Sequence, residues 1–157
     1  MKLAYVFWHR PRDGVDPADY EATLRAFHAT LELPSASFRL ASLPFDPGGS
    51  GYEDWYLVDG WAQLGQLNDD AVAAVRRGEH DAAAHASAEG WAGVYRLVRG
   101  AAEPPRAVRW VTKPAGPSYR EFIGSLDAPT VWLRQMVLGP APEFCLVEGE
   151  PDGRVAV

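Results

Sequence analysis

The sequence predicts an α+β fold built from two similar units, and three observations lead to this prediction. The segment DWYLVDG at residues 54–60 returns as EFCLVEG at residues 143–149. The segment AYVFWHRP at residues 4–11 returns, with less similarity, as AVRWVTKP at residues 107–114. In both halves of the chain an apolar run is followed by a helical stripe and then by two further apolar runs. An internal repeat of this kind predicts a repeated architecture.

The first unit is predicted to span residues 1–100 and to begin with a strand over residues 3–8, an apolar run typical of a strand buried on both faces. A helix follows, because Asp16 is a good N-cap and Pro17 fits the first turn. The apolar stripe of this helix consists of Tyr20, Leu24, Phe27 and Leu31. Further strands are predicted over residues 37–45, 55–58 and 94–98, and helices over residues 61–75 and 80–89.

The second unit, residues 101–157, is shorter and repeats only the first part of this order. A strand is predicted over residues 108–112, and Ser118 with Glu121 forms a capping box that begins a helix. The strands of both units are apolar on both sides, so the sheet face opposite the helices must also be covered. The last predicted strands of this unit are residues 130–138 and 143–147.

The composition excludes several classes of function. The chain of 157 residues has 15 basic and 21 acidic residues, a net charge of −6, and its basic residues are scattered. We therefore predict no nucleic-acid partner, because such a partner needs a basic patch. No apolar run is long enough to cross a bilayer or to be a signal peptide, so we predict no membrane partner and a cytoplasmic location. The single cysteine, Cys145, lies in an apolar run and is interpreted as a core residue.

The predicted order, βαββαβ followed by βαββ, is that of tandem ferredoxin-like repeats. The strand starts at 4–11 and 107–114, the paired strands at 55–60 and 144–149, and the WAQL segment at 61–64 together resemble the dimeric α+β barrel superfamily. This superfamily includes ABM-like (antibiotic-biosynthesis monooxygenase-like), EthD-like, NIPSNAP-like and chlorite dismutase-like proteins. The resemblance implies antiparallel sheets packed as an α+β barrel and association as a homodimer. It concerns layout and carries no catalytic residue over.

The candidate site residues lie mostly where strands end. His9 and Arg10 stand at the end of the first strand, and Lys113 holds the position that matches Arg10 in the second unit. Polar groups at strand ends converge on ligands in many proteins, so Arg10 and Lys113 are candidates for binding an anionic ligand. Arg109 is a further candidate, because a charge inside an apolar strand faces solvent, a sheet edge or a cavity. The alternative is that these are ordinary exposed charges.

The six tryptophans leave two interpretations open. Trp8 and Trp110 either line an aromatic cavity for a flat organic ligand or fill a core between apolar strand faces. His80 and His85 stand five residues apart, whereas a helical metal pair needs a spacing of three or four. The chain carries no recognisable cofactor-binding motif, and we predict neither a cofactor nor a metal ion.

Two classes of function remain. In the first, the chain binds a small organic or anionic molecule, or is a structural α+β barrel, with no chemistry of its own. In the second, it is a cofactor-independent monooxygenase or isomerase that acts on an aromatic or polyketide-like ligand. His9 would then remove a proton, while Arg10, Arg109 or Lys113 held an anionic oxygen.

Overall fold

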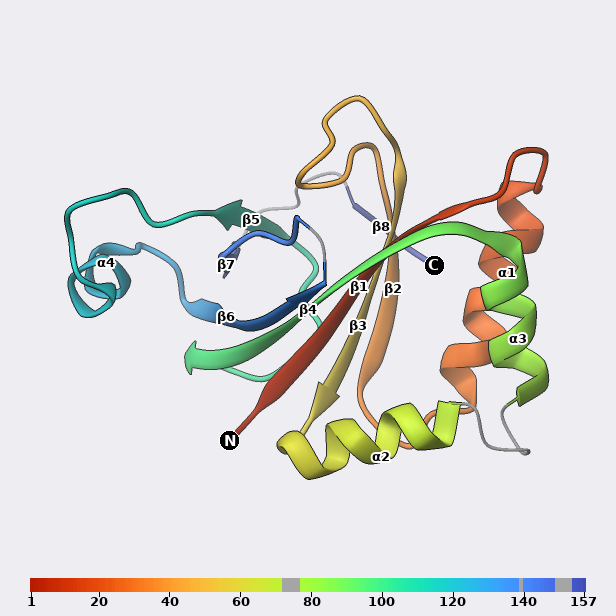
Figure 1. The fold of residues 1–157 in the computed structure, drawn as a ribbon, viewed down its shortest axis with the longest axis horizontal. Coiled ribbons are helices and arrows are strands. Elements are labelled where there is room, and N and C mark those ends of the chain that lie inside the picture. Colours follow the sequence, from red (N-terminus) through yellow and green to blue (C-terminus); the bar gives the residue numbers. More distant parts are fainter. Residues whose placement is uncertain (72–76, 139, 149–153) are drawn as a thin grey trace.

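The computed structural model describes residues 1–71, 77–138, 140–148 and 154–157. Within these residues the chain has an α+β fold, so the predicted class is confirmed (Figure 1). Its elements are β1 (Leu3–Pro11), α1 (Pro17–Ala29), β2 (Ser35–Leu40), β3 (Gly51–Val58), α2 (Trp61–Ala71), α3 (Arg77–Ala86), β4 (Ser87–Arg99), β5 (Val108–Val111), α4 (Tyr119–Ser125), β6 (Thr130–Leu138), β7 (Phe144–Val147) and β8 (Val155–Ala156).

The strands of the described residues form one antiparallel sheet in the order β5-β7-β6-β4-β1-β3-β2-β8. They therefore form a single sheet rather than the several packed sheets that the resemblance implied. Both halves of the chain contribute to it, and they are joined by the pairings of β4 with β6 and of β2 with β8. The two copies of the repeated segment lie in β3 and β7, and each is flanked by two strands of its own half: β1 and β2 for β3, β5 and β6 for β7.

Helices α1 and α4 begin where local signals predicted. Asp16 is the N-cap of α1, and its carboxylate accepts hydrogen bonds from two backbone N–H groups of the first turn. Ser118 and Glu121 form the capping box of α4. The buried face of α1 consists of the first three residues of the predicted stripe, Tyr20, Leu24 and Phe27.

Several strand boundaries differ from the prediction because pairing overrides local preference, and β3 begins at Gly51 instead of Trp55. Strand β4 begins at Ser87, so residues 87–89 are not helical; β1 continues to Pro11, which pairs with Ser87. Strand β2 ends at Leu40, where its pairing with β3 ends at Gly51. Strand β8 had no signal in the sequence and forms by pairing with β2. Residues 72–75 of the predicted helix over 61–75 lie outside the described residues.

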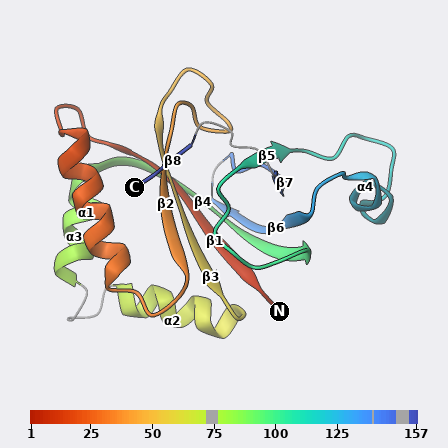
Figure 2. The same ribbon diagram turned by 180° about the vertical axis from the view of Figure 1, so that it is seen from behind.

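The two faces of the sheet differ sharply. We call one the helix face, because α1, α2 and α3 pack on it over β1 and β3 (Figures 1 and 2). Side chains alternate along β1, so Tyr5, Phe7 and His9 point to the helix face. We call the opposite face the tryptophan face, because its buried core contains Trp8, Trp55 and Trp132, with Trp110 packed against it.

The tryptophan face is the inside of a half-barrel. Trp110 lies in the edge strand β5. Its ring centre lies 5.2 Å from that of Trp8 and 6.1 Å from that of Trp55. Strand β5 stands four strands away from β1, which corresponds to roughly 19 Å in a flat sheet. The sheet must therefore curl, and the tryptophans fill the hollow that the curl creates.

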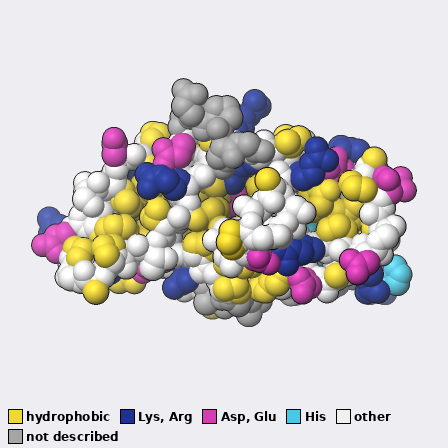
Figure 3. Space-filling model, turned by 90° about the horizontal axis from the view of Figure 1, so that it is seen from above, with side chains coloured by type: hydrophobic (Ala, Val, Ile, Leu, Met, Phe, Trp, Pro, Cys, Tyr) yellow, Lys and Arg dark blue, Asp and Glu magenta, His cyan; other side chains and the backbone are white. Residues whose placement is uncertain are grey.

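No helix in the described part of the chain is long and apolar enough to span a membrane. On the face of the molecule in Figure 3, Lys and Arg side chains lie among Asp and Glu side chains rather than apart from them. The absence of a nucleic-acid partner stays a prediction.

Candidate functional site

A cavity of about 650 Å³ lies between the helix face of the sheet and helices α1, α2 and α3. Most of its lining is apolar or aromatic, but the lining also includes members of a connected polar cluster, His9, Asp54, Ser87 and the hydroxyl-bearing Tyr56. A volume of this size with a few polar groups is typical of a site for a small molecule. The apolar lining includes Tyr5, Phe7, Phe27, Tyr56, Leu64 and Leu67.

His9 is held in one orientation from all sides. Its side chain is 1% exposed, and its ring is stacked between the rings of Phe7 at 5.3 Å and Tyr52 at 5.7 Å. Its Nδ1 lies 2.5 Å from the hydroxyl oxygen of Tyr20, and its Nε2 lies 3.1 Å from Oδ2 of Asp54. Both ring nitrogens are therefore engaged within the protein.

Asp54 lies within β3 and is 3% exposed. Its carboxylate accepts a hydrogen bond of 3.0 Å from the hydroxyl of Tyr56, and Nε2 of His28 lies 3.6 Å from its other oxygen. Burial alone would raise the pKa of Asp54, but the charges and hydrogen bonds of His9 and His28 lower this pKa well below its usual value. Asp54 is therefore a carboxylate at neutral pH.

His28 approaches Asp54 from the last turn of α1. Its ring stacks on that of Tyr56 at 5.1 Å with an angle of 8° between the planes, and its Nδ1 lies 2.9 Å from Oγ of Ser35. Among the described residues, the contacts of Nε2 of His9 and of His28 with the carboxylate of Asp54 are close but are not well aligned as hydrogen bonds. Burial, followed by the charge of Asp54, raises the pKa of Tyr56 well above its usual value.

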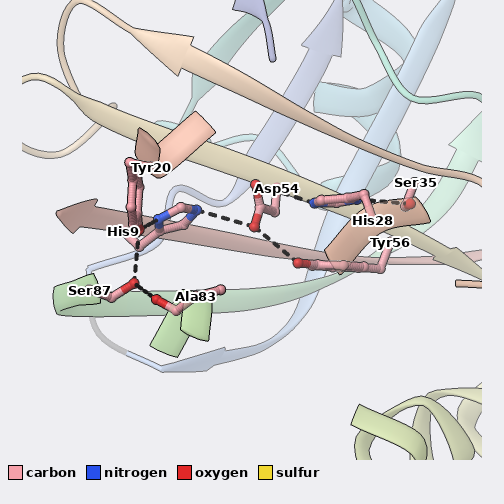
Figure 4. Close-up of polar contacts among 8 residues, drawn as sticks. All are labelled: His9, Tyr20, His28, Ser35, Asp54, Tyr56, Ala83 and Ser87. Atoms are coloured by element: carbon pink, nitrogen blue, oxygen red, sulfur yellow. Dashed lines mark hydrogen bonds and ion pairs between the residues drawn. The ribbon is translucent and has the colours of Figure 1, made fainter. Parts of the chain in front are cut away.

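Tyr20 and Ser87 continue the cluster on the other side of His9 (Figure 4). The two hydroxyl oxygens lie 2.8 Å apart, and Ser87 donates a hydrogen bond of 2.9 Å to the backbone oxygen of Ala83 in α3. Ser87 can do this because α3 ends at Ala86 and β4 begins at Ser87 itself. Burial raises the pKa of Tyr20 to about 12, so its hydroxyl keeps its proton at neutral pH.

Of the residues predicted from the sequence, His9 lies on the cavity wall, and the charged candidates lie elsewhere. Arg10 binds Asp46 at 2.7 Å and Glu89 at 3.2 Å. Arg109 forms an exposed ion pair with Glu148 at 2.9 Å. The ammonium group of Lys113 donates to two backbone carbonyl oxygens of the loop that follows it. Arg10 and Lys113 thus bind separate partners.

Trp8 and Trp110 belong to the tryptophan face and do not line the cavity. They pack edge to face with a ring distance of 5.2 Å, and the indole N–H of Trp8 donates to Glu53. The sequence left two interpretations open, and the one that applies to these two rings is core filling.

Sequence reasoning missed Tyr20, His28, Asp54 and Ser87 as site residues. Asp54 carried a usable signal, because it is an acid directly beside apolar strand residues, and an acid there must find buried partners. Tyr20 was assigned only to the apolar stripe of α1. Ser87 carried no signal, because its position depends on where β4 begins.

Across residues 1–71, 77–138, 140–148 and 154–157, no three His, Cys, Asp or Glu side chains are arranged to hold a metal ion. Comparison of the chain with models of protein families, with curated proteins and with solved structures found no match. The function is therefore inferred from the geometry of the site alone.

Proposed function

We propose that the protein binds a small, largely apolar organic molecule in the cavity on the helix face. The observation that carries this proposal is a cavity of about 650 Å³ whose mostly apolar lining meets a polar cluster at His9, Asp54 and Ser87. Apolar walls supply affinity by excluding water, while a few polar groups fix the orientation of the ligand.

An aromatic or polyketide-like ligand fits this cavity best. The rings of Tyr5 and Phe7 are nearly parallel, with 13° between their planes, and those of Phe7 and His9 differ by 19°. Three rings in a row along β1 present a regular aromatic wall. Flat conjugated molecules pack well against such a wall by offset stacking or edge-to-face contact.

A second candidate function is proton transfer on such a ligand, by an isomerase or a cofactor-independent monooxygenase. The pairing of His9 with the carboxylate of Asp54 favours it. A histidine whose orientation is fixed by a buried carboxylate is a common general acid or base. This function would use the same cavity, so the test of binding comes first.

Binding is tested with the fluorescent aromatic probe 1-anilinonaphthalene-8-sulfonate and with native mass spectrometry of freshly purified protein. We expect saturable binding of the probe and a co-purified small molecule. Ala84→Trp should block both, because Ala84 lines the cavity from α3. Ala82→Trp is the matched control, since Ala82 is an exposed residue of α3 outside this cavity. Equal binding by both variants would contradict the proposal.

We also infer that the chain consists of two ferredoxin-like repeats, as the sequence suggested. Two corresponding contacts support this. The hydroxyl of Tyr119 donates to Glu143 in the second half, whereas Tyr20 reaches the corresponding Asp54 through His9 in the first. Association as a homodimer stays a prediction, which sedimentation equilibrium would test.

A further inference from the structure

His9 lines the cavity, but its nitrogens do not face an incoming ligand. Nδ1 is engaged by Tyr20 and Nε2 by Asp54, while the faces of the ring are covered by Phe7 and Tyr52. A ligand can therefore be linked to His9 by hydrogen bonds only through another group.

Ser87 is the group in the right place. It lines the cavity, its side chain is only partly buried, and its hydroxyl contacts Tyr20, which contacts His9 in turn. Figure 4 shows Tyr20 standing between the ring of His9 and the hydroxyl of Ser87. Tyr20 itself is 1% exposed, so Ser87 is the member of this hydrogen-bonded series that a ligand can contact.

When the contacts Ala83–Ser87, Ser87–Tyr20 and Tyr20–His9 are all hydrogen bonds at once, their donors have one consistent order. The carbonyl of Ala83 can only accept, so the proton of Ser87 points to it. The oxygen of Ser87 then accepts from Tyr20, and the oxygen of Tyr20 accepts from Nδ1–H of His9. A proton on Nε2 would face the carboxylate of Asp54 at 3.1 Å, whereas a lone pair there would be repelled. These contacts favour the form of His9 in which both ring nitrogens carry a proton.

We propose that Ser87 and Tyr20 form an oxyanion subsite and that the ligand is a phenol or an enol bound through its ionised oxygen. Ser87 turns its hydroxyl from Ala83 to the ligand oxygen, and Tyr20 links this hydrogen bond to the positive charge of His9. This inference rests on the proposed function, because it needs a ligand in the cavity.

The electrostatics favour this assignment. An oxyanion inside an apolar cavity is costly unless it accepts a hydrogen bond, and hydrogen bonds linked to a charged group are the strongest available. The same hydrogen-bonded series can deliver a proton. Ser87 gives its proton to the ligand oxygen, Tyr20 gives its proton to Ser87, and Nδ1 of His9 gives its proton to Tyr20. His9 is then neutral, with Nε2–H still facing Asp54, and no proton is gained from solvent.

Two probes of similar shape test the subsite: 4-nitrophenol, which ionises, and 4-nitroanisole, which does not. At a pH where 4-nitrophenol is ionised, we expect the wild-type chain to bind it about tenfold or more tightly than 4-nitroanisole, the effect of one hydrogen bond to a charged group. The absorbance of bound 4-nitrophenol as a function of pH gives its pKa in the site. Other ionisable groups near His9 or on the lining are Tyr5, Asp54, His28, Tyr52, Tyr56, His80 and Glu89.

Ser87→Ala and Tyr20→Phe should abolish the preference for 4-nitrophenol and raise the pKa of the bound probe by about one unit relative to wild type. Both should still bind 4-nitroanisole. Tyr52→Phe is the control. The hydroxyl of Tyr52 donates to Glu21, which is not part of the series Ser87–Tyr20–His9, and the ring of the variant still covers His9. Thermal unfolding followed by circular dichroism verifies that each variant is folded, and Ser87→Ala, the milder change, carries the test if Tyr20→Phe does not fold.

Equal binding of the two probes by the wild-type chain, or a Ser87→Ala variant that keeps the preference, overturns the oxyanion subsite and leaves the cavity as a ligand site. Failure of both probes and of 1-anilinonaphthalene-8-sulfonate to bind overturns the proposed function as well.

Discussion

Glu53 and Asp54 are neighbours in β3, and both are buried, yet their side chains point to opposite faces of the sheet. On the tryptophan face, Glu53 accepts hydrogen bonds from the indole N–H groups of Trp8 at 2.8 Å and Trp55 at 2.6 Å. It also forms an ion pair at 2.8 Å with Arg154, and the side chains of the pair are 0% and 2% exposed. These three partners of Glu53 are fixed donors in a filled core.

On the helix face, Asp54 stands beside a cavity, and two of its neighbours are the histidines His9 and His28. Histidines gain and lose protons near neutral pH in ordinary surroundings, whereas indole and guanidinium groups do not. The comparison teaches that burial alone does not mark a functional carboxylate. The partners distinguish the two: Glu53 has fixed donors in a filled core, whereas Asp54 has titratable partners beside a cavity, which makes Asp54 the candidate for a functional group.

The largest expected effect comes from breaking the pair on the tryptophan face. Arg154→Met leaves the charge of Glu53 buried without its cation and should lower the free energy of unfolding by about 3–5 kcal/mol, measured by urea denaturation. Arg109→Met removes an exposed ion pair with Glu148 and should cost less than about 1 kcal/mol. Similar losses in the two variants would show that the ion pair in the core contributes no more than one on the surface.

A smaller effect, and one that depends on pH, is expected on the helix face. Asp54→Asn should lower the free energy of unfolding by about 2 kcal/mol at neutral pH, because hydrogen bonds and charge contacts to a carboxylate are lost. The pKa of Asp54 is lowered in the folded chain, so its contribution is present above the unfolded pKa of about 4 and is lost as the pH falls through the folded pKa. Urea denaturation at several pH values should therefore show the stabilities of wild type and variant converging in acid. A gap that stays constant down to low pH would contradict this account.

The smallest effect concerns the shape of the cavity. A Cβ on Gly90 would lie 2.5 Å from Cζ of Phe7, so Gly90→Ala must displace that ring from the cavity wall. We expect a loss of about 1–2 kcal/mol in stability and weaker binding of 1-anilinonaphthalene-8-sulfonate. Gly65→Ala has no atom within 4 Å of the new Cβ and should stabilise α2 by up to about 1 kcal/mol without changing probe binding. If Gly90→Ala binds the probe with unchanged affinity, Phe7 does not contribute to the binding site.

Local signals predicted much of the fold. Asp16 and Ser118 each place a side-chain oxygen at a helix start, and that interaction needs only nearby backbone groups. The start of β4 was not predictable in this way, because residues 87–89 favour a helix until β1 supplies a partner strand. Strand β8 likewise exists only through its pairing with β2.

Of the site residues, only His9 was predicted from the sequence. Its position directly after an apolar strand pointed to a cavity mouth, and it does line the cavity. Arg10 stood beside it in the sequence but does not line the cavity, and its guanidinium group binds Asp46 and Glu89. Nothing local distinguishes Asp54 from Glu53, since alternation along a strand assigns them to opposite faces without saying which face is hollow.

The bond between Glu53 and Arg154 spans 101 positions of the chain. During synthesis on the ribosome, the glutamate emerges long before its cation does, so the half-barrel cannot close around it in order of translation. Until then only the two indoles can hold the acid. A nascent chain halted before the arginine should therefore have a loosened interior that chaperones and proteases would recognise.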